Sequence, residues 1–497
     1  MTERTLAQQL GSFAASTSYA DLPAEVVDSV RKRVLDTVGI MVAAAPLETS
    51  RSARRWVRSQ GGVPRASAVG VDDRLPATLA AFVNGVLAHS LDYDDTHLPS
   101  VLHPSATVIP AALAAAERAG ANGEQLVRAI ALGLETCVRL GMAGYDEAAK
   151  NSVFFEHGQH ATSICGAMGG AVAASVLAGA DEDAIVHTLG VAASMASGII
   201  EANRTGGTVK RVHCGWAAHA AVSAAELVEF GLTGPPTVLE GRFGFFQAWL
   251  HGSFDASAVT DGLGTEWAVP DIFFKPYPAN HFTHAAVDAA ARLRERGVKP
   301  DQVERLTLGV PAPNLRTIGE PIEVKRAPET GYMAQFSGPY AVAVGLFGGS
   351  GLGAGVDDYT DALAQDPDRR ALMAKVDVVA DERCTEIFPH QFPAVLSVRL
   401  TDGSELTEDV LTTRGGPQRP LSFEELSEKF EANTARTLDR ARAQALAEAC
   451  AGLETCRDLG AVLAPLRGVD PGGDGAAATD ETKHESTSTA GATSSEG

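Results

Sequence analysis

The chain has 497 residues, which is long enough to bury a large core and to form two domains. Its formal net charge of −21 argues against nucleic acid or an anionic membrane as a partner, so an anionic ligand would need a local cationic pocket. Hydrophobic residues make up 45% of the chain but aromatic residues only 6%, and a core this rich in alanine and glycine predicts closely packed helices.

The cysteines and the start of the chain predict a compartment. Six cysteines are scattered without a CxxC pair or zinc-ligand spacing, which is typical of reduced thiols. The first residues contain no signal-peptide pattern, and the longest apolar runs, such as residues 39–46, are shorter than a bilayer span. We therefore expect a cytoplasmic protein with no membrane partner.

Apolar residues at helical spacing predict that the first half of the chain is helical. The predicted helices cover residues 4–15, 22–45, 76–91, 105–119, 123–142, 161–174, 183–200 and 216–230. Between the last two, residues 205–215 are rich in glycine and are predicted to form a loop. This loop lacks the GxxxxGK pattern of a nucleotide-binding loop, so we do not expect it to hold a nucleotide.

The pattern changes near residue 269. Alternating apolar residues predict strands at 306–310 and 396–400, with helices near 332–347 and 357–375 between them and helices again at 422–430 and 434–453. The predicted fold class is therefore mainly α: a large all-helical domain (residues 1–268 and 411–467) with an inserted smaller α/β lid domain (residues 269–410). Residues 468–497 have almost no apolar bulk, which predicts a disordered tail.

A run of carboxylates and imidazoles lies between two of the predicted apolar helices. It contains Asp92, Asp94, Asp95, His97 and His103. So much polarity between buried helices costs stability unless it is satisfied or used. A histidine just before a helix N-terminus also lies where backbone N–H groups favour anions. The alternative is that the aspartates cap helix ends and the histidines are solvated, and for any single residue the two interpretations are equally good.

The same side chains would suit a hard divalent metal ion by ligand type. However, no HxH, HExxH or comparable spacing supports a metal site, and lysines at positions 210 and 275 would be unusual companions for one. We therefore predict that the protein uses no metal.

Three further polar groups stand in apolar or glycine-rich surroundings: His160, Lys210 with Arg211, and Lys275 with His281 and His284. Taken singly, a lysine is usually solvated and a histidine is usually a satisfied core residue. Together they suit a polycarboxylate substrate, because lysines bind carboxylates, histidines move protons at neutral pH and an aspartate orients an imidazole. Cations would also stabilise the enediolate-like charge that develops next to a carboxylate. These requirements favour elimination, decarboxylation or epimerisation.

These segments resemble a known family. The motifs are Asp92-Tyr-Asp-Asp-Thr-His97, His103-Pro-Ser-Ala-Thr107, His160-Ala-Thr-Ser-Ile-Cys-Gly166, Lys210-Arg-Val-His-Cys-Gly-Trp-Ala-Ala-His219 and Lys275-Pro-Tyr-Pro278. In this order they resemble the signature of the MmgE/PrpD family, and the similarity extends over residues 5–465. That family includes 2-methylcitrate dehydratase, cis-aconitate decarboxylase and iminodisuccinate epimerase.

The resemblance implies a helical domain with an α/β lid, a homodimer, and catalysis without metal or organic cofactor. It places the catalytic pocket at Asp92, Thr96, His103, His160, Lys210 and Lys275, and we expect His97, His284 and Arg211 to contact substrate as well. His157 is close to His160 in a departure from the family pattern, so either could enter the pocket. The lid tyrosine of the decarboxylase has no clear counterpart in residues 311–323.

We therefore expect a cofactor-independent lyase acting on a small di- or tricarboxylate. Dehydration of a 2-methylcitrate-like hydroxy acid is the first choice, and decarboxylation of cis-aconitate or epimerisation of a related acid are the alternatives within the family. A metal-dependent hydrolase and a non-catalytic relative that only binds a carboxylate are the alternatives from other classes.

Overall fold

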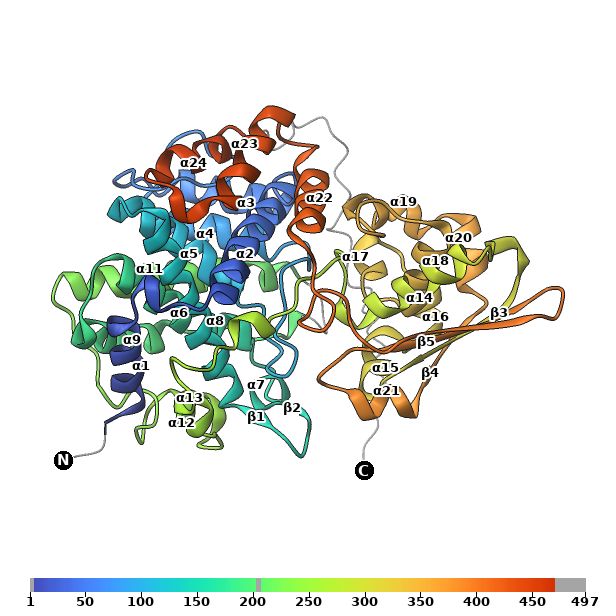
Figure 1. Cartoon of the computed structure of the whole chain (residues 1–497), viewed down its shortest axis with the longest axis horizontal. Helices are drawn as coiled ribbons and strands as arrows, with labels where there is room; N and C mark the ends of the chain where they lie inside the picture. Colours follow the sequence, from blue (N-terminus) through green and yellow to red (C-terminus); the bar gives the residue numbers. More distant parts are fainter. Residues whose placement is uncertain (1–3, 203–206, 470–497) are drawn as a thin grey trace, which may run out of the picture.

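The computed structural model describes residues 4–202 and 207–469. This part of the chain is mainly helical, which confirms the predicted fold class. Figure 1 shows a large helical part on one side and a smaller part that carries a four-stranded sheet on the other. Among the described helices, none is long and apolar enough to cross a membrane.

The large part is a stack of apolar helices. They are α1 (Leu6–Ser16), α2 (Ala24–Ala43), α3 (Glu48–Arg58), α4 (Ala77–Ala88), α5 (Ser105–Ala119), α6 (Gly123–Met142), α7 (Val153–Glu156), α8 (Ala161–Leu177), α9 (Glu182–Met195), α11 (Val209–Glu229), α12 (Phe245–Leu250) and α13 (Ser257–Thr260). Strands β1 (Tyr145–Asp146) and β2 (Asn151–Ser152) form a short hairpin. Every residue of α8 is buried, between α5, α6, α9 and α11. Small residues allow this, since a Cβ on Gly169 would lie 2.3 Å from the carbonyl oxygen of Gly133.

The small part is built on strands β3 (Val303–Val310), β4 (Val376–Ala380), β5 (Ala394–Leu400) and β6 (Glu405–Val410). Their order is β4-β3-β5-β6, with β4 parallel to β3 and the other neighbours antiparallel. The helices of this part are α14 (His284–Glu295), α15 (Leu315–Ile318), α16 (Ile322–Arg326), α17 (Gly331–Ala334), α18 (Gly338–Phe347), α19 (Asp361–Ala364), α20 (Pro367–Met373) and α21 (Glu382–Ile387). Helix α14 packs on β5 and β6, and α18 packs on α14 and β4.

The chain then returns to the large part. Helices α22 (Phe423–Thr434), α23 (Arg440–Ala451) and α24 (Leu459–Arg467) lie against α2, each other and α5. Two large hydrophobic cores result: one uses residues between 6 and 274 and between 421 and 469, and the other uses residues between 277 and 410. A small third cluster consists of Leu98, Phe273 and Phe392. The domain boundaries at 269 and 410 stay predictions. Of the predicted tail, Val469 is buried against the large core, and residues 470–497 lie outside the described residues.

One predicted loop is partly helical. Residues 205–215 were expected to be irregular, but α11 begins at Val209, so Lys210 and His213 lie on its first turns. The glycine that suggested a loop has a packing role, because a Cβ on Gly215 would lie 2.5 Å from the carbonyl oxygen of Phe82 on α4. The small residue therefore brings α11 and α4 into contact and fixes the direction of the side chains at the start of α11.

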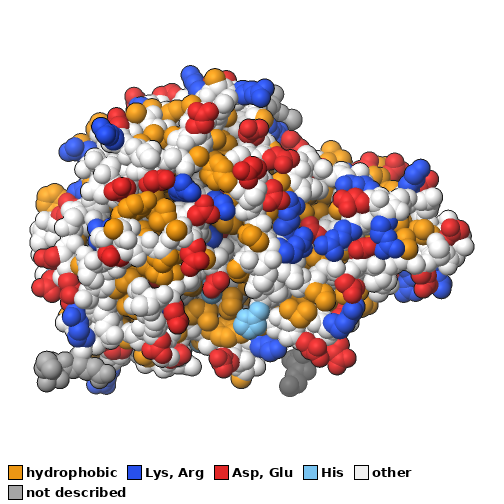
Figure 2. All heavy atoms as spheres, in the orientation of Figure 1, with side chains coloured by type: hydrophobic (Ala, Val, Ile, Leu, Met, Phe, Trp, Pro, Cys, Tyr) orange, Lys and Arg blue, Asp and Glu red, His pale blue; other side chains and the backbone are white. Residues whose placement is uncertain are grey.

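Figure 2 shows acidic and basic side chains mixed over the visible face. The small part has ion pairs at its surface, such as Arg305 with Asp377 and Arg399 with Glu405. By contrast, the predicted substrate-site residue Lys275 is only 1% exposed. A cationic site for an anion that uses Lys275 therefore lies inside the molecule.

Candidate active site

The segment between α4 and α5 folds into a buried loop. Its N–H and C=O groups at Thr96 pair with those of Phe273, with both N–O distances 2.8 Å, and His97 pairs in the same way with Leu102. Asp92 has a positive φ of 51°, a conformation that is uncommon for a residue with a side chain. Because Phe273 is held against the loop, Lys275 comes to lie beside Asp92.

Each aspartate of this loop faces a different cation. We call Asp92, Asp94 and Asp95 the carboxylate cluster. All three are less than a tenth exposed. Their partners are Lys275, whose Nζ is 2.8 Å from Asp92 Oδ1, His89, whose Nδ1 is 2.6 Å from Asp94 Oδ2, and Arg33, whose Nη1 is 2.7 Å from Asp95 Oδ2. The cluster is therefore charge-compensated by side chains of three other segments.

Lys275 donates to Asp92 twice, to Oδ1 at 2.8 Å and to the backbone oxygen at 2.9 Å. An ammonium group has three N–H bonds, so one remains for a ligand. Burial alone would raise the pKa of Asp92, but Lys275, Lys210 and His103 outweigh burial and hold that pKa well below its ordinary value. Asp92 is therefore an anion that positions Lys275.

His89, at the end of α4, is a site residue that sequence reasoning missed. Burial opposes its charge, but Asp94 raises the pKa of His89 to about 10, so the ring is an imidazolium at neutral pH. The same pair holds the pKa of Asp94 below its ordinary value against the effect of burial. The one available signal was a histidine five residues before an aspartate at the end of an apolar helix, which is weak.

Arg33 was missed as well, because it lies in the predicted helix of residues 22–45 close to Arg31, Lys32 and Asp36, and nothing in the sequence distinguishes it from these charged neighbours. Its side chain and that of Asp95 are each 1% exposed. Asp95 also accepts hydrogen bonds from the backbone N–H and the hydroxyl of Ser105, at the first residue of α5. Both carboxylate oxygens are thus occupied, and Asp95 fixes the loop onto α5.

His103 has one ring nitrogen held and one available. Its Nδ1 is 2.7 Å from the carbonyl oxygen of Asp95, which can only accept, so Nδ1 carries the proton and Nε2 is a bare acceptor. Asp94 Oδ2 lies 3.9 Å and the Thr96 hydroxyl 3.4 Å from the same nitrogen. Burial lowers the pKa of His103 to about 4, although Asp94 opposes this. With its ring 14% exposed, His103 is a neutral base at neutral pH.

His160 enters the site, whereas His157 is exposed and its ring lies 5.1 Å from that of His251. The ring centroid of His160 is 5.4 Å from that of His89 and 5.0 Å from that of His213. Burial, reinforced by His89 and Lys210, lowers the pKa of His160 well below its ordinary value. His160 is therefore a second neutral imidazole near the carboxylate cluster.

Lys210 and Arg211 start α11 on the side facing the small part. Burial would lower the pKa of Lys210, but Asp92 and neighbouring groups raise it. The guanidinium carbon of Arg211 lies 5.0 Å from the ring centre of Tyr332, on α17 of the small part. The start of α11 is thus near Asp92 through Lys210 and near α17 of the small part through Arg211.

The remaining predicted residues have local partners. His97 Nδ1 is 2.6 Å from the Ser100 hydroxyl, and burial lowers the pKa of His97 to about 4. Nε2 of His284 is 3.1 Å from the carbonyl oxygen of Ala279, and burial lowers the pKa of His284 to about 3. His97 shapes the loop, and its expected role in substrate binding stays a prediction. His284 lies in electrostatic range of Lys275 and Asp92, and so near the site.

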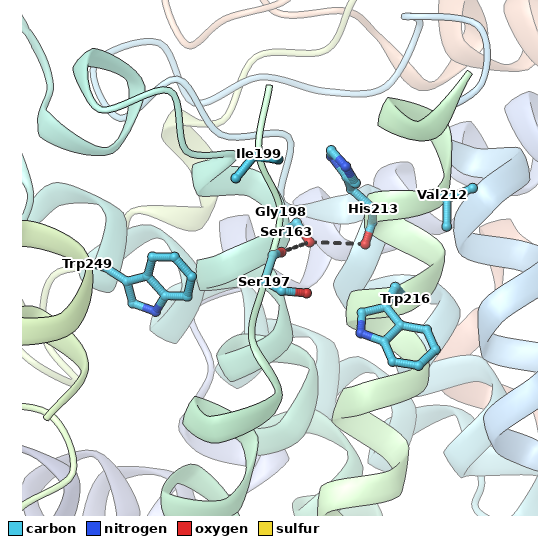
Figure 3. Close-up of a pocket in the computed structure, with 8 residues that line it drawn as sticks. All are labelled: Ser163, Ser197, Gly198, Ile199, Val212, His213, Trp216 and Trp249. Carbon is cyan, nitrogen blue, oxygen red and sulfur yellow. Dashed lines mark hydrogen bonds between the residues drawn. The ribbon is translucent and has the colours of Figure 1, made fainter. Parts of the chain in front are cut away.

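A separate pocket of about 370 Å³ lies between α8, α11 and α12. Figure 3 shows the residues that line it. It is lined by Ser163, Ser197, Gly198, Ile199, Val212, His213, Trp216 and Trp249. The ring of His213 points away from the two tryptophans in Figure 3, and its backbone oxygen accepts a hydrogen bond from Ser163. The pocket therefore adjoins the backbone that carries His213 and is not lined by the carboxylate cluster.

Within residues 4–202 and 207–469, no three His, Cys, Asp or Glu side chains are arranged to hold a metal ion. The carboxylates that would attract one already face Lys275, His89 and Arg33. The arrangement can instead bind an anion through Lys210 and Lys275 and exchange a proton through His103.

Comparisons with known proteins identify the family of the chain. Residues 8–257 match the MmgE/PrpD N-terminal domain and residues 277–454 the MmgE/PrpD C-terminal domain. The chain is 30% identical to cis-aconitate decarboxylase of Homo sapiens over 95% of this chain and 96% of that protein. It is 29% identical to the enzyme of the same name from Mus musculus, over 89% of each chain, and 25% identical to that of Aspergillus terreus, over 91% of this chain and 94% of that one. The protein belongs to the MmgE/PrpD family.

Proposed function

We propose that the protein is a cofactor-independent lyase that removes CO2 from a small tricarboxylate, with cis-aconitate as the first candidate. The observation that carries the proposal is a pair of lysines in range of Asp92, Lys275 at 2.8 Å and Lys210 through its charge, with the available Nε2 of His103 near the same carboxylate. The relatives named cis-aconitate decarboxylase, which this chain matches along nearly its whole length, support the same reaction. They also favour decarboxylation over the dehydration that the sequence alone put first.

The chemistry requires cations and one proton. When the bond to CO2 breaks, its electron pair forms a new double bond, and the pair of the old double bond moves to the carbon next to a second carboxylate. That carboxylate becomes enediolate-like, and lysine N–H groups directed at it stabilise the charge as it develops. The carbon then takes one proton, so a trianion plus H⁺ gives a dianion plus CO2.

Substrate binding itself supplies the proton donor. Burial lowers the pKa of His103 to about 4. Three carboxylates brought close to the ring would raise that pKa, because opposite charges favour the imidazolium. Nε2, the free nitrogen of His103, would then carry the proton that is delivered to carbon.

A second candidate is dehydration of a 2-methylcitrate-like hydroxy acid. The resting state of His103 favours this reaction, since a neutral imidazole with a bare Nε2 is ready to remove a proton next to a carboxylate. An epimerase would begin with the same step and return the proton to the other face. The two reactions therefore share the site and differ in what leaves the substrate.

The test is to incubate the purified protein with cis-aconitate, 2-methylcitrate and related acids and to follow proton NMR spectra in 2H2O. Loss of CO2 with one deuterium incorporated supports decarboxylation, whereas loss of water or inversion of a centre supports the alternatives. Binding without turnover of any acid would leave only a carboxylate-binding relative. Activity that disappears with EDTA and returns only with added metal would instead support the hydrolase.

A further inference from the structure

His213 provides the hydrogen bond that the described structure gives to the ring of His160. The two Nδ1 atoms are 3.1 Å apart, and both residues are less than a tenth exposed. Nε2 of His160 is buried and has no hydrogen-bond partner among the described residues. A buried nitrogen of this kind is costly unless a ligand completes it.

The backbone around the pair is tightly held. The Ser163 hydroxyl lies 3.0 Å from the carbonyl oxygen of His213 and 2.6 Å from that of Ser197. A Cβ at Gly198 would lie 3.2 Å from the Cβ of His160, so the chain on that side leaves the ring little room to shift. The Nδ1–Nδ1 contact is therefore a fixed feature of the site.

A contact between two ring nitrogens needs one proton between them. The charged groups that act on His213 are His89 and Lys210, and both are cations that, with burial, lower the pKa of His213 to about 4. The pKa of His160 is lowered too, so both rings are neutral at neutral pH. One ring must then carry its proton on Nδ1 and the other on Nε2.

The identity of the donor follows from what the site has to bind. His160 lies in electrostatic range of Lys210 and His103, which are assigned to the substrate site. A carboxylate needs a donor there, and a bare Nε2 on His160 would repel it. We propose that His213 is a positioning residue whose Nδ1–H donates to Nδ1 of His160 and so keeps a proton on Nε2 of His160, facing a substrate carboxylate. This inference rests on the proposed function.

Three substitutions separate this role from simple packing. The amide nitrogen of Asn replaces Nδ1 of histidine and can still donate, Asp at the same position can only accept, and Leu can do neither. We expect His213→Asn to retain most of kcat/KM, while His213→Leu and His213→Asp lose about ten- to a hundredfold, the range for partners that orient a functional histidine. His219→Asn is the matched control, because His219 lies on the same helix and bonds to the carbonyl oxygen of Thr78, away from the site.

Nitrogen-15 NMR spectra of histidine-labelled protein report the tautomers directly and need no turnover. The expected result is a proton on Nε2 of His160 and on Nδ1 of His213, with His160 changing its tautomer in His213→Asp. The opposite tautomers in the parent, or a His213→Asp enzyme as active as His213→Asn, would overturn the proposal. An inactive parent that shows the expected tautomers would contradict the proposed function and leave the positioning contact intact.

Discussion

The carboxylate cluster and the neutral imidazoles (His103, His160 and His213) lie next to each other but differ in charge. The carboxylates are paired with cations, whereas the imidazoles are uncharged. Asp92, Asp94 and Asp95 are ionised or ion-paired because Lys275, His89 and Arg33 face them. Among the described residues these imidazoles face no carboxylate at such short range, and burial lowers the pKa of His103 and of His213 to about 4. Fixed charge and movable protons are thus kept on different side chains.

This separation has a consequence for how the site works. Ion pairs among protein groups hold the loop in shape whether or not a ligand is bound. A ligand that brings negative charge would raise the pKa of the imidazoles, which would couple proton transfer to binding. The comparison predicts that substitutions in the imidazoles affect turnover, while those in the carboxylate cluster affect stability first.

The largest expected effect is on turnover at His103. In His103→Asn the amide nitrogen can still donate to the carbonyl oxygen of Asp95, but the Nε2 atom is missing. Loss of a general acid or base should lower kcat by about 10²–10⁴-fold. The melting temperature should stay within a few degrees of the parent because the loop contact survives. His157→Asn, at an exposed histidine, serves as the control, and a His103→Asn enzyme with near-parent turnover would remove His103 from the mechanism.

The next effect is on stability at Asp95. Asp95→Leu leaves Arg33 buried without its carboxylate, which should reduce the free energy of unfolding by about 3–5 kcal/mol. The double change Arg33→Met with Asp95→Leu should recover much of this loss. Chemical denaturation measures both, with Glu405→Ala as a control, because its exposed pair with Arg399 should contribute less than about 1 kcal/mol. A single variant as stable as the parent would show that the pair is not needed.

The residues of these ion pairs differ in whether they could be predicted from the sequence. The loop from Asp92 to His103 could be identified because polar residues stood between two apolar helices, and Lys275 because it stood in an irregular polar segment. Arg33 and His89 could not, because Arg33 is one of several charged residues in its predicted helix and His89 follows an apolar helix, so neither sequence context indicates the partner. Their pairing depends on the tertiary contact of α2, α4 and the loop, which no local spacing encodes.

Likewise, the elements of the fold could be predicted only where the local sequence pattern was regular. Long helices with a regular apolar pattern, such as α6, were predicted to within a few residues. The start of α11 was missed, since the glycines near position 207 predicted a loop and the helix gains its stability from packing on α4. Strands β4 and β6 were missed because their burial depends on pairing with β3 and β5.

A smaller effect is expected for substrate binding at Lys210. Lys275→Met would also strip Asp92 of its partner, so Lys210→Met is the cleaner test. Losing one charge-assisted contact of about 1.5–3 kcal/mol should weaken tricarboxylate binding roughly ten- to a hundredfold. Calorimetric titration of a non-reactive tricarboxylate measures this, with the exposed Lys299→Met as the control. Affinity should also depend less on salt in Lys210→Met, and equal affinity in both proteins would move the anion site elsewhere.

The smallest effect concerns pH, where His89, paired with Asp94, and the buried neutral ring of His97 act in opposite directions. The pKa of His89 is raised to about 10, so its contribution to stability is complete below about pH 6.5, the ordinary pKa of histidine, and is lost as the pH rises through 10. Burial lowers the pKa of His97 to about 4, so the unfolded chain binds that proton first and stability falls as the pH drops from 6.5 to 4.

Melting temperatures measured from pH 5 to 9 should therefore change with a shallower slope below pH 6.5 in His97→Gln, and with a shallower slope above it in the double variant His89→Leu with Asp94→Leu. Each change should be at most about one proton per molecule. Slopes equal to those of the parent on both sides would mean that neither the imidazolium of His89 nor the buried neutral ring of His97 controls how stability depends on pH.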